Sequence, residues 1–123
     1  MITPSAELKE KVEKYQSYPI IVEGKKDAVV LKSHGFYRVF LLHMPSVSIK
    51  ERVESIVGAL TYHEPVVILT DLDKKGNQLH DDVKKILQVH GFPTDETLRK
   101  ILLHAKISHI EGMSNFLDEL DDA

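Results

Sequence analysis

Short apolar runs alternate along this chain with longer segments of helical character, and this alternation constrains the fold most. Residues 19–23, 37–42 and 66–70 are rich in β-branched and aliphatic side chains. Such short, continuous apolar runs are typical of strands buried on both faces. Helical segments of about 10–15 residues between strands indicate βαβ units and a parallel sheet, with helices packed on both faces.

Capping residues predict where the helices lie. Thr3 before Pro4 indicates a helix over about residues 4–16, and Ser48 with Glu51 forms a capping box for a helix near 48–63. Helices are also expected over about residues 25–34, ending at Gly35, and 77–90. Thr94 opens another short helix, residues 106–110 are expected as a fourth strand, and a short helix follows from residue 112.

These elements predict one α/β domain over residues 1–123. The expected architecture has three layers, α/β/α, around a central and mostly parallel four-stranded sheet. The acidic end, at about residues 117–123, is expected to be a frayed tail.

Composition and charge exclude several kinds of site. The 123 residues include no cysteine, which removes disulfides, thiolate zinc sites and cysteine nucleophiles. The absence of cysteine suits a cytoplasmic protein, which is expected, and no membrane span or signal peptide is visible. The net charge is −3, but residues 111–123 carry five acids and no Lys or Arg, which leaves +2 for the rest. Nucleic-acid affinity would therefore need a local basic patch or bound metal.

Carboxylates follow two of the predicted strands. Glu23 ends the first strand, and Asp71 and Asp73 follow the third. If these strands are neighbours, about 5 Å apart, the three carboxylates converge at one edge of the sheet. Like charges so close raise one another's pKa values unless a cation compensates, and Mg²⁺ prefers oxygen ligands. The pattern predicts an Mg²⁺ site, which Mn²⁺ can also fill; the alternative is that the two aspartates only begin a turn.

Further residues near these turns have two interpretations each. Asp27 either complements a helix dipole or belongs to the metal site, where it supports the ligands or binds a second ion. Gly24 and Gly76 are expected to permit tight turns. Glu111 is either an additional acid at the same edge or a surface carboxylate. Four lysines flank the acids and either contact nucleic-acid phosphates or are solvated: Lys25, Lys26, Lys74 and Lys75. The seven histidines lack metal-site spacing and are expected to be surface or structural, and Arg99 is expected on an exposed helix face.

Two stretches resemble the motifs of the Toprim family. Residues 20–27 form an apolar strand ending in Glu-Gly, and residues 66–76 form one ending in Asp-x-Asp with a nearby glycine. The resemblance implies a Rossmann-like fold, Glu23 as acid–base catalyst, and Asp71 and Asp73 as metal ligands. Lys75 departs from the topoisomerase pattern, which has Glu there, and the chain has no primase zinc module. The stretch is most similar to the branch of 5S ribosomal RNA maturation nucleases, without their RNA-binding extension.

Two functions are therefore expected. The first is Mg²⁺-dependent phosphodiester chemistry on RNA or DNA, by a nuclease or phosphoryl-transfer enzyme, with RNA processing as one setting. The alternative is a non-catalytic module that binds nucleic acid or protein in a replication, repair or RNA-processing complex. A receiver-like or nucleotide-binding domain ranks third, because the chain lacks a Walker or Gly-x-Gly-x-x-Gly motif. A homodimer is left open.

Overall fold

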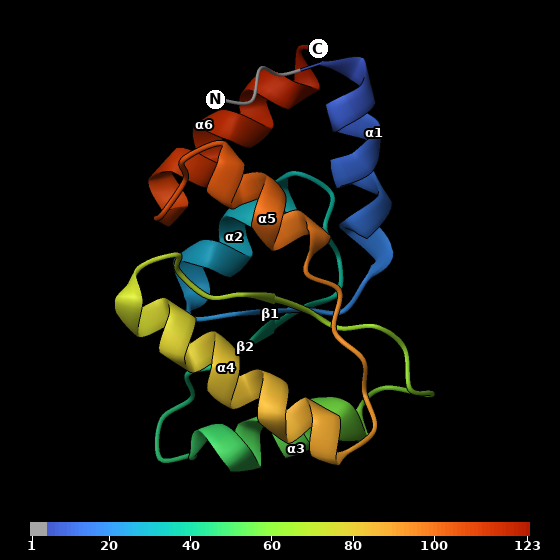
Figure 1. Ribbon diagram of the computed structural model, residues 1–123, viewed down its shortest axis with the longest axis vertical. Helices are drawn as coiled ribbons and strands as arrows, with labels where there is room; N and C mark the ends of the chain where they lie inside the picture. The colour runs from blue at the N-terminus through green and yellow to red at the C-terminus, as the bar shows by residue number, and fades with distance from the viewer. Residues whose placement is uncertain (1–4) are drawn as a thin grey trace.

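The computed structural model describes residues 5–123, except for the side chains of residues 110 and 111. A parallel sheet of three strands in the order β2-β1-β3 lies between two layers of helices (Figure 1). The strands are β1 (Ile20–Val22), β2 (Val39–Leu41) and β3 (Val67–Leu69). Val22 pairs with Leu41 on one side and Leu69 on the other, so all three strands end at one edge.

The helices form two layers because the strands are apolar on both faces. Ile20 and Val22 pack toward one layer, which contains α1 (Ala6–Glu13), α2 (Lys25–Ser33), α5 (Thr97–His104) and α6 (Ile110–Asp121). Ile21 and Ile68 pack toward the other, α3 (Ile49–Gly58) and α4 (Lys74–Val89). The α/β class and the helices on both faces agree with the expectation.

Capping explains most helix boundaries. Ser48 accepts a hydrogen bond from the backbone of Glu51 at 3.1 Å, and Gly35 ends α2 with a φ of 91°. Ser5 caps α1, which a 3₁₀ helix extends over Lys14–Ser17; the expected cap at Thr3 lies outside the described residues. Helix α4 begins at Lys74, earlier than expected, because Asp73 caps it. Among the helices described, none is long and apolar enough to cross a membrane.

The expected fourth strand is wrong. Lys106 has a φ of 60°, and the amide of Ile107 returns to the carbonyl of Leu102, so this segment ends α5 and leads into α6. Within residues 5–123, the sheet gains only an isolated bridge between Val66 and Thr94, and no fourth strand forms. Thr94 therefore extends the sheet, and α5 begins at Thr97.

The acidic end is helical where a frayed tail was expected. Helix α6 continues to Asp121, with Met113, Phe116, Leu117 and Leu120 all buried. These positions follow the i, i+3, i+4, i+7 spacing of one helix face. The exposed Asp118, Glu119 and Asp121 lie on the opposite face. The segment is therefore an amphipathic helix, which its high charge made look like a tail.

Strand β2 lies at the outer edge of the sheet. It pairs only with β1 among the described strands, and it has just three residues. The guanidinium of Arg52, from α3, donates a hydrogen bond of 2.6 Å to the carbonyl of Leu41. Pro45 follows shortly after the strand and has no amide hydrogen to offer.

Candidate metal site at the carboxyl edge of the sheet

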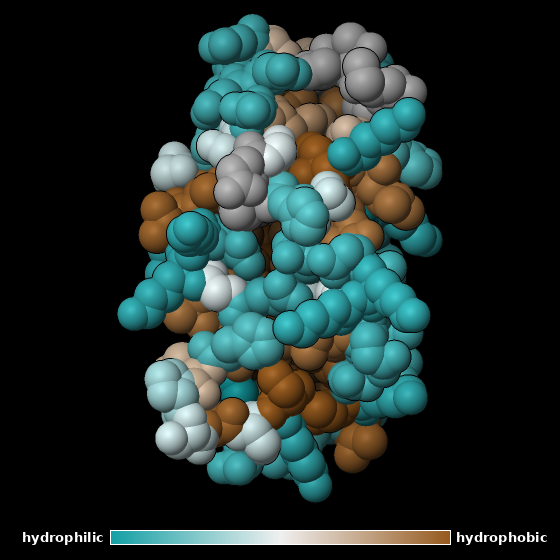
Figure 2. Space-filling view, turned by 90° about the vertical axis from the view of Figure 1, so that its left-hand side faces the viewer, coloured by the Kyte–Doolittle hydropathy of each residue, from teal (hydrophilic) through white to brown (hydrophobic). Residues whose placement is uncertain are grey.

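Glu23 and Asp71 meet at the edge where the strands end. Glu23 directly follows β1, Asp71 lies two residues beyond β3, and the two strands are neighbours, as expected. The two side chains are close enough to share a hydrogen bond. Figure 2 views the molecule from this edge and shows hydrophilic side chains across the middle of the face. Two separate stretches of chain therefore deliver carboxylates to one place.

The electrostatics at Glu23 are unfavourable to a second negative charge. Partial burial, the charge of Asp71 and the hydrogen bond to it, followed by the charges of Asp27 and Asp73, raise the pKa of Glu23 to about 7. Two carboxylates can share a hydrogen bond only when one carries a proton. A cation at this position would replace that proton and relieve the repulsion.

Asp73 and His109 border the same position. The carboxylate of Asp73 accepts a hydrogen bond from the backbone of Gly76 at 2.7 Å through Oδ1, and its second oxygen can serve a cation. His109, at the start of α6, places Nδ1 at 3.8 Å from Oδ2 of Asp71. One ligand atom from each of Asp71, Asp73 and His109 lies within 4.8 Å of the others. The sequence did not indicate His109 as a ligand, because the histidines lack metal-site spacing.

Gly76 fixes the approach of α4 to Asp71. The sequence suggested a turn glycine, but Gly76 is buried in the first turn of the helix. A Cβ here would collide with the backbone carbonyl of Asp71. Thr70 reinforces the contact by donating its hydroxyl to the carbonyl of Gly76 at 2.7 Å. The glycine is thus needed for close packing, not for an unusual backbone angle.

The side chain of Arg99, from α5, binds the backbone that follows β3. Its side chain is buried, not exposed as the sequence suggested, and donates to the carbonyls of Thr70 at 2.6 Å and Asp71 at 3.0 Å. It also donates to the side chain of Asn77 at 2.9 Å. Burial lowers the pKa of Arg99, while nearby acids oppose this effect. Arg99 lies three residues before the buried Leu102 on the same helix, a weak sequence signal of burial.

The remaining predicted residues lie at the starts of helices α2, α4 and α6. Asp27 accepts a hydrogen bond from the backbone of Gly24 at 3.3 Å, and Gly24 is extended with a φ of −145°. The exposed Lys25 and Lys26 line the same open depression as Glu23, Asp27, Asp71, His43 and His109. Lys74 and Lys75 are exposed in the first turn of α4. Glu111 belongs to α6 and not to a strand end, and its side chain lies outside the described residues.

Comparison with known proteins gives a consistent set of relatives. No family model matches the chain. A UPF0292 protein of Archaeoglobus fulgidus is 30% identical over 117 residues, covering 93% of this chain and 86% of its own. A UPF0292 protein of Pyrococcus abyssi is 32% identical over 99 residues, covering 78% and 71%. The solved structure of a putative protein from Aquifex aeolicus has a TM-score of 0.73 and 28% identity, covering 89% of this chain and 98% of its own.

These findings correct the resemblance to the Toprim family. The sequence relatives carry the UPF0292 name, and nothing in the comparisons points to Toprim proteins or to 5S ribosomal RNA maturation nucleases. The two motifs are short. Apolar strands followed by acids are expected in any parallel sheet that gathers carboxylates at one edge, so the pattern indicated the geometry and not the family.

Proposed function

The chain belongs to the UPF0292 family, and we propose that it binds Mg²⁺ at Glu23, Asp71 and Asp73 and uses it for phosphodiester chemistry on RNA or DNA. The observation that carries this proposal is that the carboxyl groups of Glu23 and Asp71 meet at the ends of neighbouring strands. Partial burial, followed by the charge of Asp71, raises the pKa of Glu23 to about 7. A stable fold has no need of this repulsion, whereas a cation site does.

The donor set fits a hard divalent ion. Glu23, Asp71 and Asp73 offer oxygen ligands, and Mg²⁺ commonly combines one or two carboxylates with water and substrate phosphate. Arg99 lies beneath the site, but its guanidinium donates to backbone carbonyls and to Asn77, not to these carboxylates. The positive charge at the carboxylates themselves would therefore come from the ion. Mn²⁺ is expected to substitute.

The residues around the cluster suit a phosphate substrate. When bound, the ion would polarise a phosphoryl oxygen and stabilise developing negative charge. Glu23 is also the proposed acid–base residue, because its carboxyl group would lie beside the phosphate; the pKa of about 7 describes the metal-free site, and a bound ion would lower it. Lys25 and Lys26 begin α2 beside it, and the amide groups of a helix N-terminus also favour an anion.

The test combines metal binding with a cleavage assay. Isothermal titration with Mg²⁺ and Mn²⁺ would be paired with labelled single-stranded and double-stranded RNA and DNA. We expect Glu23→Gln to lower cleavage by about 100-fold or more, because both a ligand and a proton carrier are lost. Glu119→Gln, which removes an exposed carboxylate on α6, is the matched control. Cleavage that persists in Glu23→Gln would contradict the proposal.

A second candidate is a non-catalytic module that binds nucleic acid or protein. The capping roles of Asp27 and Asp73 favour it, since both carboxylates already serve helix starts without metal. This candidate predicts oligonucleotide binding that is independent of Mg²⁺ and weakened when Lys25 and Lys26 lose their charge. Calorimetry that detects no divalent cation, even with oligonucleotide present, would favour it over the enzyme.

A further inference from the structure

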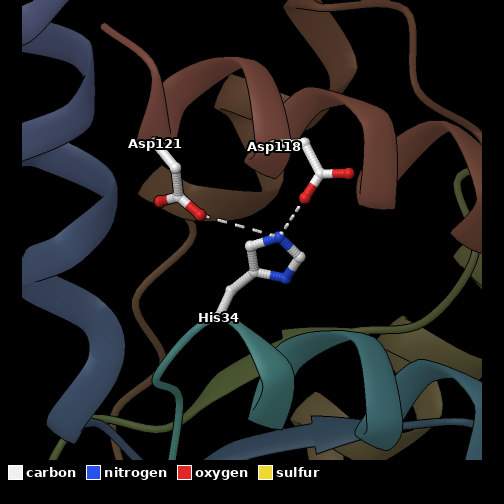
Figure 3. A group of neighbouring side chains, drawn as sticks. All are labelled: His34, Asp118 and Asp121. Atoms are coloured by element: carbon white, nitrogen blue, oxygen red, sulfur yellow. Dashed lines mark hydrogen bonds and ion pairs between the residues drawn. The ribbon is translucent and has the colours of Figure 1, made fainter.

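A second group of potential metal ligands lies at the other end of α2. His34 caps the C-terminus of this helix and points toward Asp118 and Asp121 of α6 (Figure 3). Its Nε2 lies 2.8 Å from Oδ1 of Asp118 and 3.8 Å from Oδ2 of Asp121. The His34 side chain is only 9% exposed, whereas the two aspartates are 66% and 60% exposed. The imidazole is therefore held in place, and the carboxylates remain free to adjust.

The other ring nitrogen fixes the orientation of the imidazole. Nδ1 of His34 lies 2.9 Å from the carbonyl of Val30, and Ser33 donates its hydroxyl to the same carbonyl at 2.7 Å. A carbonyl can only accept, so Nδ1 carries the hydrogen. At 2.8 Å from the carboxylate of Asp118, Nε2 also carries a hydrogen when no metal is bound, so His34 forms an ion pair with Asp118. A divalent cation would replace the Nε2 proton, and the freed nitrogen and the two carboxylates would then be its ligands.

We propose that His34, Asp118 and Asp121 bind a divalent metal ion of the zinc type. Histidine ligands commonly donate their second ring N–H to a backbone carbonyl, the arrangement that Val30 provides here. Zinc bonds of about 2.0–2.1 Å in tetrahedral geometry set ligand atoms about 3.3 Å apart. The distances of 2.8 and 3.8 Å lie on either side of this value.

The chemistry of the group favours zinc over magnesium. An imidazole nitrogen suits Zn²⁺, whereas Mg²⁺ prefers oxygen ligands alone. Lys9 of α1, which lies close by, donates to the backbone carbonyl of Asp121 at 3.3 Å, and this contact leaves the carboxylate of Asp121 to the metal. The exposure of both aspartates gives room for water as the fourth ligand.

The bound ion would clasp α6 to α2. Helix α6 contributes Met113, Phe116, Leu117 and Leu120 to the core, and the clasp would hold its last turns over that core. The proposal is independent of the phosphodiester function, because it uses none of the residues at the carboxyl edge. Acidification should weaken metal binding, because a proton competes with the ion for Nε2. The charged groups of α1 that border this position are Lys9 and Glu13.

The test uses Zn²⁺ and Co²⁺ on the full chain carrying Asp71→Asn, which disables the first site. We expect saturable Zn²⁺ binding, a rise in Tm, and visible absorption bands of tetrahedral Co²⁺. Both His34→Gln and Asp118→Asn should weaken binding by at least about tenfold. Asp118 is exposed, so its variant should fold even if the histidine variant does not.

Asp122→Asn is the matched control, because it removes a carboxylate from the same helix end without altering the three ligands. It should bind Zn²⁺ as the parent does. Absence of saturable Zn²⁺ binding in the parent would overturn the proposal and leave a histidine–aspartate ion pair. Equal binding in the parent and Asp118→Asn would also overturn it, since the metal would then lie elsewhere.

Discussion

The two ends of the strands, called the amino edge and the carboxyl edge, differ in how their charged side chains are arranged. At the amino edge, Arg38 meets Glu64 through two hydrogen bonds of 2.6 and 2.7 Å, and Glu64 is buried. The hydrogen bond to Arg38 holds the pKa of Glu64 below its ordinary value. At the carboxyl edge, Glu23 faces Asp71, and its pKa rises. The amino edge thus holds a pair of opposite charges, whereas the carboxyl edge holds two acids.

This difference gives the two edges opposite dependence on pH. Glu64 binds protons more weakly in the folded chain than in the unfolded chain, so its stabilisation is present above its unfolded pKa and is lost on acidification. Glu23 binds protons more strongly in the folded chain, so its favourable contribution is lost as pH rises toward 7. The amino edge thus favours stability at neutral pH, whereas the carboxyl edge opposes it until a cation binds.

The largest expected effect comes from breaking the amino-edge pair. Glu64→Ala should lower the free energy of unfolding by about 3 kcal/mol, because Arg38 loses both hydrogen bonds and its compensating charge. Urea unfolding at pH 7 would measure the change. Asp71→Asn at the opposite edge should raise stability when metal is absent. If both substitutions destabilise equally, the contrast between the edges is wrong.

Close packing at the carboxyl edge should give the next effect. Gly76→Ala should cost about 1–3 kcal/mol, since the added methyl group collides with the carbonyl of Asp71 and displaces the start of α4. Gly58→Ala, in α3, is the control, because its Cβ would meet nothing within 4 Å. That change should stabilise by about 0.5–1 kcal/mol. Thermal unfolding of both variants distinguishes packing from helix propensity, and a neutral Gly76→Ala would refute the close approach.

Removing the charge of Glu23 should reveal its pH dependence. Between its ordinary pKa of 4.5 and the raised value of about 7, the metal-free parent should lose stability relative to Glu23→Gln. After allowance for solvent screening at this half-buried group, we expect a difference of about 1 kcal/mol at pH 8. Denaturation curves at pH 4 and pH 8 measure it. Mg²⁺ should stabilise the parent more than the variant, and parallel pH profiles would contradict this account.

The smallest effect on stability is expected at the two lysines. Lys25→Ser and Lys26→Ser should each change the free energy of unfolding by less than about 0.5 kcal/mol, because both side chains are exposed. Oligonucleotide affinity should nevertheless fall, and the slope of log K against log[salt] should decrease by about one for each lost phosphate contact. Fluorescence anisotropy at several salt concentrations would measure this slope. An unchanged slope would place the substrate elsewhere.

The sequence predicted the acidic edge because strand geometry determines it. Residues that follow neighbouring parallel strands must lie near one another, so Glu23 and Asp71 could be paired once the first and third strands were taken as neighbours. The helices on both faces followed from the continuous apolar runs by the same reasoning. Local rules were sufficient wherever one residue type had one structural consequence, as at Gly35.

Features that depend on distant contacts could not be predicted in this way. The burial of Arg99 depends on free carbonyls at the end of β3, which no local pattern reveals. The segment before α6 resembled a strand because Ile107 and Ile110 are β-branched, but Lys106 in the left-handed region turns the chain there. Residues 117–121 were predicted as a tail because of their negative charge. The apolar positions of the segment nevertheless repeat with the period of a helix.

The outer strand β2, which is short and partly hydrogen-bonded to Arg52, affects how the protein can self-associate. An open strand edge recruits further strands through unpaired amides and carbonyls, and this one is only three residues long. Arg52 already occupies the carbonyl of Leu41, and Pro45 interrupts any extension of the pairing. A second molecule therefore finds little template for continuing the sheet, and fibre growth from this side is disfavoured.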